Sequence, residues 1–370
     1  MRVLILYVSV GTGHMKAAEA LKESIERQFS GWSVDVFDTL KYINPVIDKI
    51  VVGSYLGALK RSPGLYSRLY TASGSGTGIY DVSKAINKIL SFKLNSLIND
   101  YKPSAVVCTH PFPMQMLSTL KERKKLTIPA VAVLTDYVVH SLWLDNGMDA
   151  FIVANDLMKT EMMERGIPGN IIFPYGIPVS PKFLTAADKN KLKLELGLDN
   201  KFTVLVMGGG MGFGNIENAM ASLLDCDIDI QIIAVTGTNQ KLKTQLEQSA
   251  IKSKKKVLVL SYTDKINELM DISDLLITKP GGMTISEALV KGLPIFIISP
   301  IPGQEEGNAN FLLRSGVASK IEDSSQLINV LSRVANDPVT LNTMRENSRF
   351  WSKPHSASDI ASLLGKLVSG

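Results

Sequence analysis

The stretch that decides the fold of the first half of the chain is RVLILYVSVGTGH, residues 2–14. Its first seven residues are mostly apolar, which is typical of a strand buried on both faces of a sheet. Gly11 and Gly13 then permit a tight turn, and a helical apolar period follows over Met15–Gln28. A buried strand that passes through a glycine turn into a helix is typical of the opening of a Rossmann-like α/β domain.

A second stretch of the same kind, TVLVMGGGMGFGN, occupies residues 203–215. Around both stretches, short apolar runs alternate with helical patterns such as Val82–Leu97 and Asn239–Ile251. In the first half the predicted strands are Val3–Val8, Val34–Phe37, Ala105–Cys108, Ala130–Leu134, Phe151–Val153 and Ile171–Phe173. In the second half they are Thr203–Met207, Ile230–Val235, Val257–Leu260, Leu275–Thr278 and Pro294–Ile298. Two such series predict an α/β protein of two Rossmann-like domains, each a doubly wound parallel sheet.

The boundary between the two domains is predicted at YGIPVSPK, residues 175–182, because this stretch is rich in Pro and Gly and has no regular period. We therefore expect one domain at 1–178 and a second at 179–352. A last helical segment at 353–370 follows, for which packing back on the first domain is one option.

The composition is that of a globular protein with a sizeable core, because 45% of the 370 residues are hydrophobic and 20% are charged. The net charge of +5 is too small for diffuse nucleic-acid binding, so we expect no nucleic-acid partner. The two cysteines allow no disulfide framework, which suits a reducing compartment. No apolar run approaches the length that spans a bilayer, and the first residues lack a cleavage-site pattern. These features predict a cytoplasmic protein.

Three of the four histidines follow predicted strands of the first domain, at the edge of the sheet where ligands bind. His14 closes the glycine turn, where Lys16 replaces the third glycine of a dinucleotide fingerprint. His110 follows the third strand, and Asp136 follows the fourth. His140 lies four residues beyond Asp136, on the same face if this stretch is helical. A histidine or a carboxylate here can act as a general base, and the alternative for each histidine is a structural role.

Two glycine-rich turns follow strands of the second domain. GGGMGFG, residues 208–214, leaves backbone N–H groups free to surround a phosphate, but no Gly-Lys-Ser/Thr sequence follows it. TKPGGMTISEA, residues 278–288, places Glu287 in the first turns of a helix, where it can bind a ribose diol or simply stabilise the helix. PGQEEGNAN, residues 302–310, carries the polar groups that a sugar requires, and the alternative is a run of charges that stabilises a helix N-terminus.

The pattern DCDID, residues 225–229, contains Asp-x-Asp, which holds a divalent metal in some enzyme families. Here it precedes a predicted strand and so lies at the amino edge of the sheet, away from the ligand side. We therefore expect no essential metal.

With these motifs in place, the chain resembles the monogalactosyldiacylglycerol synthase and processive diacylglycerol β-glucosyltransferase family, within glycosyltransferase family 28. The resemblance covers nearly the whole chain and implies a GT-B fold, in which two Rossmann-like domains face each other across a cleft. It is carried by GTGH at 11–14, TDY at 135–137 with His140 and Trp143, TKPGG at 278–282 and PGQE at 302–305.

The resemblance implies an inverting hexosyltransferase that uses a UDP-sugar and no cofactor, with His14 as the general base and Asp136 as the competing candidate. The residues implied for the nucleotide sugar are Gly209, Gly210, Met211, Gly212, Phe213, Thr263, Pro280, Gly281, Gly282, Met283, Thr284, Glu287, Gln304, Glu305 and Asn308. Those implied for the acceptor are Gly13, His110, Tyr137, His140 and Trp143.

The acceptor implied by the resemblance is a membrane lipid, most simply diacylglycerol, and the segment at 41–78 matches the family's lipid-acceptor region. Residues 41–70 carry five basic side chains against one acidic one, among apolar and aromatic residues. The spacing fits an amphipathic helix packed on the first domain as well as one docked on a membrane, but the concentration of basic charge favours an anionic membrane. We therefore expect a peripheral protein on the inner face of the cell membrane. The alternatives are a sugar-nucleotide epimerase of the same fold, a peptidoglycan-precursor-type N-acetylglucosaminyl transferase, and a membrane-docking sensor without catalysis.

Overall fold

The computed structural model describes residues 1–9, 11–43, 78–212, 215–301 and 303–369. Most of the predicted membrane segment, residues 44–77, and the predicted donor-site residue Phe213 lie outside them.

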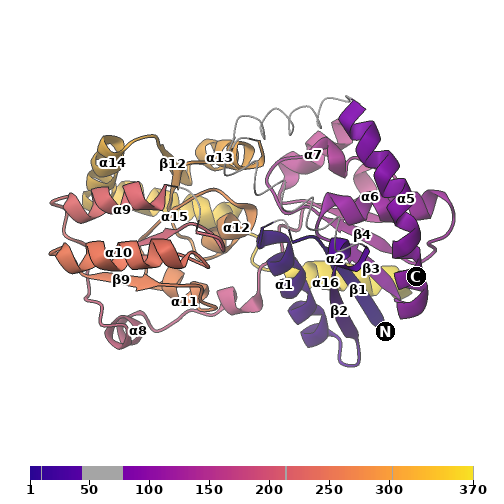
Figure 1. The fold of residues 1–370 in the computed structure, drawn as a ribbon, viewed down its shortest axis with the longest axis horizontal. Coiled ribbons are helices and arrows are strands. Elements are labelled where there is room, and N and C mark those ends of the chain that lie inside the picture. Colours follow the sequence, from indigo (N-terminus) through magenta and orange to yellow (C-terminus); the bar gives the residue numbers. More distant parts are fainter. Residues whose placement is uncertain (10, 44–77, 213–214, 302, 370) are drawn as a thin grey trace. The chain divides into compact units, whose positions relative to one another are not determined.

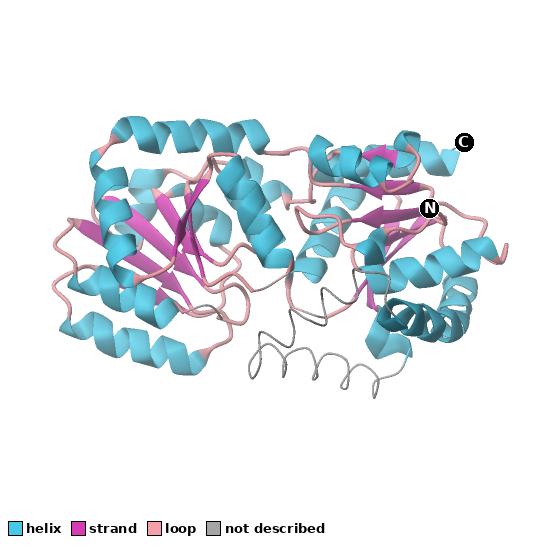
Figure 2. Ribbon diagram, turned by 90° about the horizontal axis from the view of Figure 1, so that it is seen from above, coloured by secondary structure: helices cyan, strands magenta, loops and turns pink. Residues whose placement is uncertain are grey.

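The described chain forms two compact units, each a parallel sheet between layers of helices (Figure 1, Figure 2). The first unit comprises Met1–Pro181, Ile301–Gln304 and Lys353–Gly370, and the second comprises Lys182–Pro300 and Glu305–Ser352.

The first unit is built on six strands in the order β2-β1-β3-β4-β5-β6, and every neighbouring pair is parallel. Its strands are β1 Arg2–Tyr7, β2 Ser33–Asp38, β3 Ala105–Cys108, β4 Ala130–Val133, β5 Ala150–Ile152 and β6 Ile172–Phe173. Its helices are α1 Gly13–Gln28, α2 Thr39–Ile43, α5 Gly78–Tyr101, α6 Pro111–Glu122, α7 Asp156–Glu164 and α16 Ser356–Ser369, with short 3-10 turns η1 Ser141–Trp143 and η2 Gly169–Ile171.

The core of the first unit lies on both faces of this sheet, because β1 carries apolar residues at successive positions. Val3 and Ile5 are fully buried with Leu21 and Ile25 of α1. Leu4 is equally buried, and alternate residues of a strand face opposite sides, so the other face is covered too. The near-continuous apolar run at residues 2–8 is therefore explained by burial on both faces.

The last helix, α16, completes the core of the first unit. Its Ile360 and Leu364 are fully buried in the same apolar cluster as Leu21 of α1. Gly365 faces the ring of Phe29, where an added Cβ would stand 2.9 Å from a ring carbon. The close approach of α16 to α1 therefore depends on a small residue at this position.

The second unit repeats this architecture with strands in the order β12-β11-β10-β7-β8-β9, again all parallel. Its strands are β7 Phe202–Met207, β8 Ile230–Val235, β9 Val257–Leu260, β10 Leu275–Thr278, β11 Ile295–Ile298 and β12 Ala318–Ile321. Its helices are α8 Lys189–Glu195, α9 Ile216–Asp225, α10 Gln240–Lys252, α11 Ile266–Asp271, α12 Gly282–Val290, α14 Ser324–Asn336 and α15 Pro338–Trp351. Helix α13 Gln304–Arg314 begins at the junction of the units, and the 3-10 turn η3 Pro181–Leu184 precedes α8.

Each of the eleven predicted strands coincides with a strand of the structure to within one residue at either end. The strand that was not predicted is β12, at one edge of the second sheet. Only Ile321 of its four residues is buried, so it presents no apolar run. Among the described residues, no helix combines the length and the apolar character needed to cross a membrane.

Candidate active site

Both sheets contain a point where the order of the strands reverses. In the first unit the chain goes from β1 to β2 on one side and then to β3 on the other. In the second unit β7 leads to β8 and β9 on one side, and the chain then continues to β10 on the other. Ligands of open α/β sheets bind outside the carboxyl ends of the strands at such a switch point. The carboxyl ends of β1 and β3, and those of β7 and β10, are therefore where each unit is expected to hold a ligand.

His14 lies at the switch point of the first unit, in the first turn of α1. Its Nδ1 is 2.7 Å from the carbonyl oxygen of Thr109, the residue that follows β3. The same nitrogen is 2.9 Å from the hydroxyl oxygen of Thr135, just beyond β4. The Thr109 hydroxyl donates in turn to the carbonyl oxygen of His14 at 2.9 Å. The ends of β1, β3 and β4 are thus tied together through this one side chain.

These contacts decide which nitrogen of His14 can act as a base. A carbonyl oxygen only accepts, so Nδ1 must carry the proton that it donates to Thr109. In the neutral ring Nε2 then has the free lone pair, which is the form a general base requires. Burial lowers the pKa of His14 below 6.5, although the Asp136 carboxylate and the Thr109 carbonyl oppose this shift. The ring is consequently neutral near pH 7, with Nε2 available to take a proton.

His110 has the opposite tautomer. It is the N-cap of α6, and its Nδ1 accepts a hydrogen bond from the backbone N–H of Phe112 at 3.1 Å. The proton of the neutral ring is therefore on Nε2. The rings of His110 and His14 meet edge to face, with centroids 4.6 Å apart. Burial, and then the positive charge that His14 would carry, lower the pKa of His110 well below 6.5. Two neutral imidazoles thus lie side by side.

The stretch between Asp136 and Trp143 is not a regular helix, so the condition for placing Asp136 and His140 on one helical face is not met. The backbone turns over residues 136–140, and only Ser141–Trp143 forms a 3-10 turn, which His140 caps by accepting from the Leu142 N–H. The β-branched residues at 138 and 139 and the local cap favour turns over a regular helix. Tyr137, His140 and Trp143 are all buried. Their role in binding the acceptor stays a prediction.

The glycine-rich loop of the second unit follows β7 and is held close to the end of β8. Gly209 and Gly212 have φ of 66° and 65°, a region that favours glycine. A Cβ on Gly212 would stand 2.3 Å from the carbonyl oxygen of Thr236, so no larger residue fits there. The backbone N–H of Thr238 donates to the carbonyl oxygen of Gly210 at 3.0 Å. These contacts hold the predicted diphosphate loop, including Met211, against the residues that follow β8.

The second glycine turn lies directly across the switch point, after β10. Gly281 is the N-cap of α12, so the backbone N–H groups of Gly282, Met283 and Thr284 are at a helix N-terminus, which favours an anion. The carbonyl oxygen of Pro280 accepts from Nδ2 of Asn308 at 3.0 Å, and Asn308 is fully buried. This contact of Asn308 therefore orients the turn, and its predicted sugar contact stays a prediction.

Lys279 links the donor-site residues in a way that the sequence did not predict. Its Nζ forms an ion pair of 2.5 Å with Oε1 of Glu305, and both side chains are largely buried. Its Cε lies 3.4 Å from the place where a Cβ of Gly209 would stand. Lys279 is part of the TKPGG motif, so its place in that motif was the available signal.

Two other predicted donor-site residues belong to the second unit. Glu287 is partly buried in α12, and Thr263 follows β9, where its hydroxyl accepts from the Lys265 N–H at 3.2 Å. Gln304 is the first residue of α13 and is grouped with the first unit. Thr263 is farthest from the switch point, because β8 lies between β7 and β9.

The acidic pattern at 225–229 lies at the amino end of β8, as expected. Asp225 ends α9, and Asp229 pairs with Lys201 at 2.8 Å. Within the described residues no group of three or more His, Cys, Asp or Glu side chains is placed to hold a metal ion.

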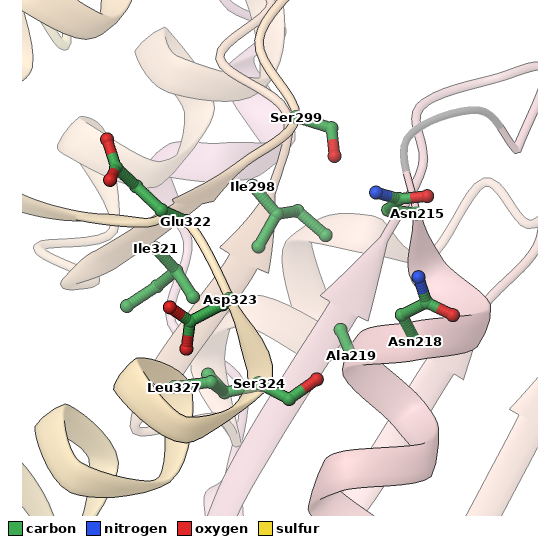
Figure 3. Close-up of a pocket in the computed structure, with 10 residues that line it drawn as sticks. All are labelled: Asn215, Asn218, Ala219, Ile298, Ser299, Ile321, Glu322, Asp323, Ser324 and Leu327. Carbon is green, nitrogen blue, oxygen red and sulfur yellow. The ribbon is translucent and has the colours of Figure 1, made fainter.

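A pocket of about 80 Å³ lies at the carboxyl ends of β11 and β12, between the starts of α9 and α14 (Figure 3). Asn215 and Asn218 line one side, and Asp323 and Ser324 line the other. Drug-sized ligands occupy roughly 300–1,000 Å³, so this pocket is too small for a whole nucleotide sugar. It contains none of the predicted donor-site residues.

The arrangement of the described chain is similar to that of several solved structures. MurG from Acinetobacter baumannii matches with a TM-score of 0.64 at 16% identity, over 99% of each chain. HepE from Anabaena in complex with UDP-glucose matches with a TM-score of 0.60 at 16% identity, over 100% of this chain and 99% of that one. The UDP-GlcNAc 2-epimerase from Neisseria meningitidis matches with a TM-score of 0.64 at 14% identity, over 99% and 100%. At these identities the likeness concerns the fold alone, and that fold is GT-B.

Sequence comparisons are more specific. Residues 14–179 match the model of monogalactosyldiacylglycerol (MGDG) synthase, and residues 203–364 match the glycosyltransferase family 28 C-terminal domain. The processive diacylglycerol β-glucosyltransferase of Bacillus subtilis is 30% identical over 94% of this chain and 90% of its own. That of Staphylococcus epidermidis is 29% identical over 98% and 93%. The chain belongs to this family of glycosyltransferases, within family 28, and is an enzyme of that class.

Proposed function

We propose that the protein transfers a hexose from a UDP-sugar to the free hydroxyl of diacylglycerol, giving a β-glycosyldiacylglycerol. The observation that carries the proposal is the geometry of His14, whose Nδ1 is held by Thr109 so that Nε2 is a neutral base at the switch point. The choice of diacylglycerol as the acceptor is based on the relatives, which are called diacylglycerol β-glucosyltransferases.

In the proposed reaction the acceptor oxygen attacks C1 of the sugar as its proton moves to Nε2 of His14. The bond from C1 to the diphosphate breaks, and UDP leaves with the electron pair. The Asp136 carboxylate favours the charged form of His14 and so stabilises the imidazolium that this step produces. Attack from the face opposite the leaving group inverts C1, which gives the β-glycoside from an α-linked donor.

The donor is proposed to lie over the switch point of the second unit, with its diphosphate between the loop at Gly209 and the N-terminus of α12. Backbone N–H groups and the helix dipole then stabilise the leaving group. We also propose that no metal is required, because the acidic pattern at 225–229 is at the opposite edge of the sheet. Turnover that is lost on chelation and restored by Mg²⁺ or Mn²⁺ would contradict this.

The place of action is proposed to be the inner face of the cell membrane, because the acceptor is a lipid. Support comes from the sequence of residues 41–70, which joins basic and apolar side chains.

The test is an assay of the purified protein with diacylglycerol in mixed micelles and, in turn, UDP-glucose, UDP-galactose and UDP-N-acetylglucosamine. We expect a glycolipid of the mass of one added hexose, with NMR coupling of a β-anomer. An epimerised nucleotide sugar formed without lipid would indicate the epimerase instead. If the protein binds UDP but forms neither the glycolipid nor an epimerised nucleotide sugar, a sensor would be favoured.

A further inference from the structure

Lys279 occupies a position between the two groups that the donor site would present to its ligand. It follows β10 directly, and β10 is the neighbour of β7 at the switch point. On one side its Cε approaches Gly209 of the glycine-rich loop. On the other side its Nζ is 2.5 Å from Glu305 in the first turn of α13. The Lys279 side chain thus reaches the loop for the diphosphate through its Cε, and through its Nζ a carboxylate proposed to hold the sugar.

We propose that Lys279 is a cation for the diphosphate, and that donor binding transfers it from Glu305 to the phosphate oxygens. This inference rests on the proposed function, because it assigns a role within that donor site. Glu305, once released, accepts hydrogen bonds from sugar hydroxyls. The ion pair seen here is then the resting state of the site, and its exchange couples diphosphate binding to sugar binding.

The exchange follows from the charges. A diphosphate brings more negative charge and more acceptor oxygens than a single carboxylate, so it competes well for an ammonium group with three donors. The side chains of Lys279 and Glu305 are only 18% and 12% exposed, so solvent screens them weakly. Without Lys279, the Glu305 carboxylate would repel the diphosphate across the site. Lys279 also stabilises the negative charge that grows on UDP as the bond from C1 breaks.

The experiment measures binding by calorimetry, so it does not depend on the lipid acceptor. The ligands are UDP, UDP-glucose and uridine, and the variants are Lys279→Met, Lys279→Arg and Glu305→Gln. We expect Lys279→Met to weaken UDP binding about 10- to 100-fold, as for loss of a charge-assisted hydrogen bond, and to leave uridine binding unchanged. Lys279→Arg keeps the charge and should lose less than Lys279→Met.

Glu305→Gln gives the sharper result. It removes the competing anion but keeps a side chain of the same size, so UDP should bind several-fold more tightly than to the wild type. UDP-glucose should lose whatever advantage it has over UDP in the wild type. Thermal melting of each variant shows whether the fold is kept.

Unchanged or weaker UDP binding by Glu305→Gln would overturn the exchange, and so would equal loss of uridine and UDP by Lys279→Met. The proposed function fails separately: a wild type that binds UDP as expected but makes no glycolipid contradicts only the lipid acceptor. A wild type that binds no UDP contradicts both.

Discussion

At His14, two neutral oxygens hold the ring nitrogen that a carboxylate holds in a Ser-His-Asp triad. A carboxylate at this position would favour the imidazolium strongly and raise the pKa. The Thr109 carbonyl and the Thr135 hydroxyl fix the tautomer with less effect on charge, and burial then lowers the pKa. The result is a base that is unprotonated at neutral pH but gains a proton only at some energetic cost.

The first prediction concerns His14 as the proposed base. His14→Ala should lower kcat about 10²- to 10⁴-fold, the usual contribution of a positioned base, with donor affinity nearly unchanged. Steady-state kinetics with diacylglycerol and calorimetry with UDP measure the two effects. Asp136→Asn is the comparison, because it removes the charge but leaves Nε2 of His14 in place. If Asp136→Asn is the more damaging change, the roles of the two residues must be exchanged.

The second prediction concerns stability against pH. The pKa of His110 is lower in the folded protein than in the unfolded chain, where it is about 6.5. The unfolded chain therefore binds more protons below this pH, so the free energy of unfolding falls as pH drops from about 6.5 toward the folded pKa. His110→Asn keeps a good N-cap for α6 and removes the titrating ring, so this fall should become shallower.

Urea unfolding at several pH values between 5 and 7.5 measures this effect. His355→Asn is the matched control, because it removes an exposed histidine of the same unit. If the free energy of unfolding falls equally steeply with pH for His110→Asn and for the wild type, His110 is not the source of the pH dependence.

Sequence alone located His14, His110 and Asp136, because the ends of parallel strands meet at one edge and polar residues there are conspicuous. It could not assign Thr109 and Thr135, whose roles depend on which nitrogen of His14 they face. Lys279 was overlooked for a similar reason, since its partner Glu305 lies 26 residues away in the chain.

At the scale of elements, the buried strands were predictable, because apolar runs of three to six residues bounded by turns are too short to form a buried helix. Whether the stretch after Asp136 is helical was left open by the sequence, because a spacing of four residues alone does not decide it. Histidine and asparagine caps, which bond the backbone locally, begin helices or replace them at several points in this chain. A spacing argument does not include that competition.

The third prediction belongs to α16. Leu364→Ala should lower the free energy of unfolding by about 2–5 kcal/mol, because it leaves a cavity in the core of the first unit. Lys366→Ala, at an exposed position of the same helix, should change it little. Denaturant unfolding followed by circular dichroism compares the two variants. A similar loss from both would contradict the role of core packing, because alanine is the better helix former at either position.

At the scale of the whole molecule, the fourth prediction concerns the proposed membrane segment, which lies outside the described residues. Replacing Lys49, Lys60, Arg61 and Arg68 with Gln should release the protein from anionic vesicles, since each basic residue near such a surface contributes about 1 kcal/mol. UDP binding in solution should stay normal, because the proposed donor site is in the other unit. Co-sedimentation that is equally strong for this variant at low and high salt would exclude the segment as an electrostatic anchor.

The return of α16 to the first unit has a consequence for biosynthesis. Residues 353–369 are translated after the entire second unit, yet they supply Ile360 and Leu364 to the core around β1. The second unit is therefore complete on the ribosome before the first unit can finish packing. Domains usually fold in the order in which they emerge from the ribosome. Here the first unit emerges first but cannot complete its core until α16 has been translated. A ribosome-stalled chain ending near residue 352 should accordingly expose apolar surface on α1 and offer a chaperone its binding site.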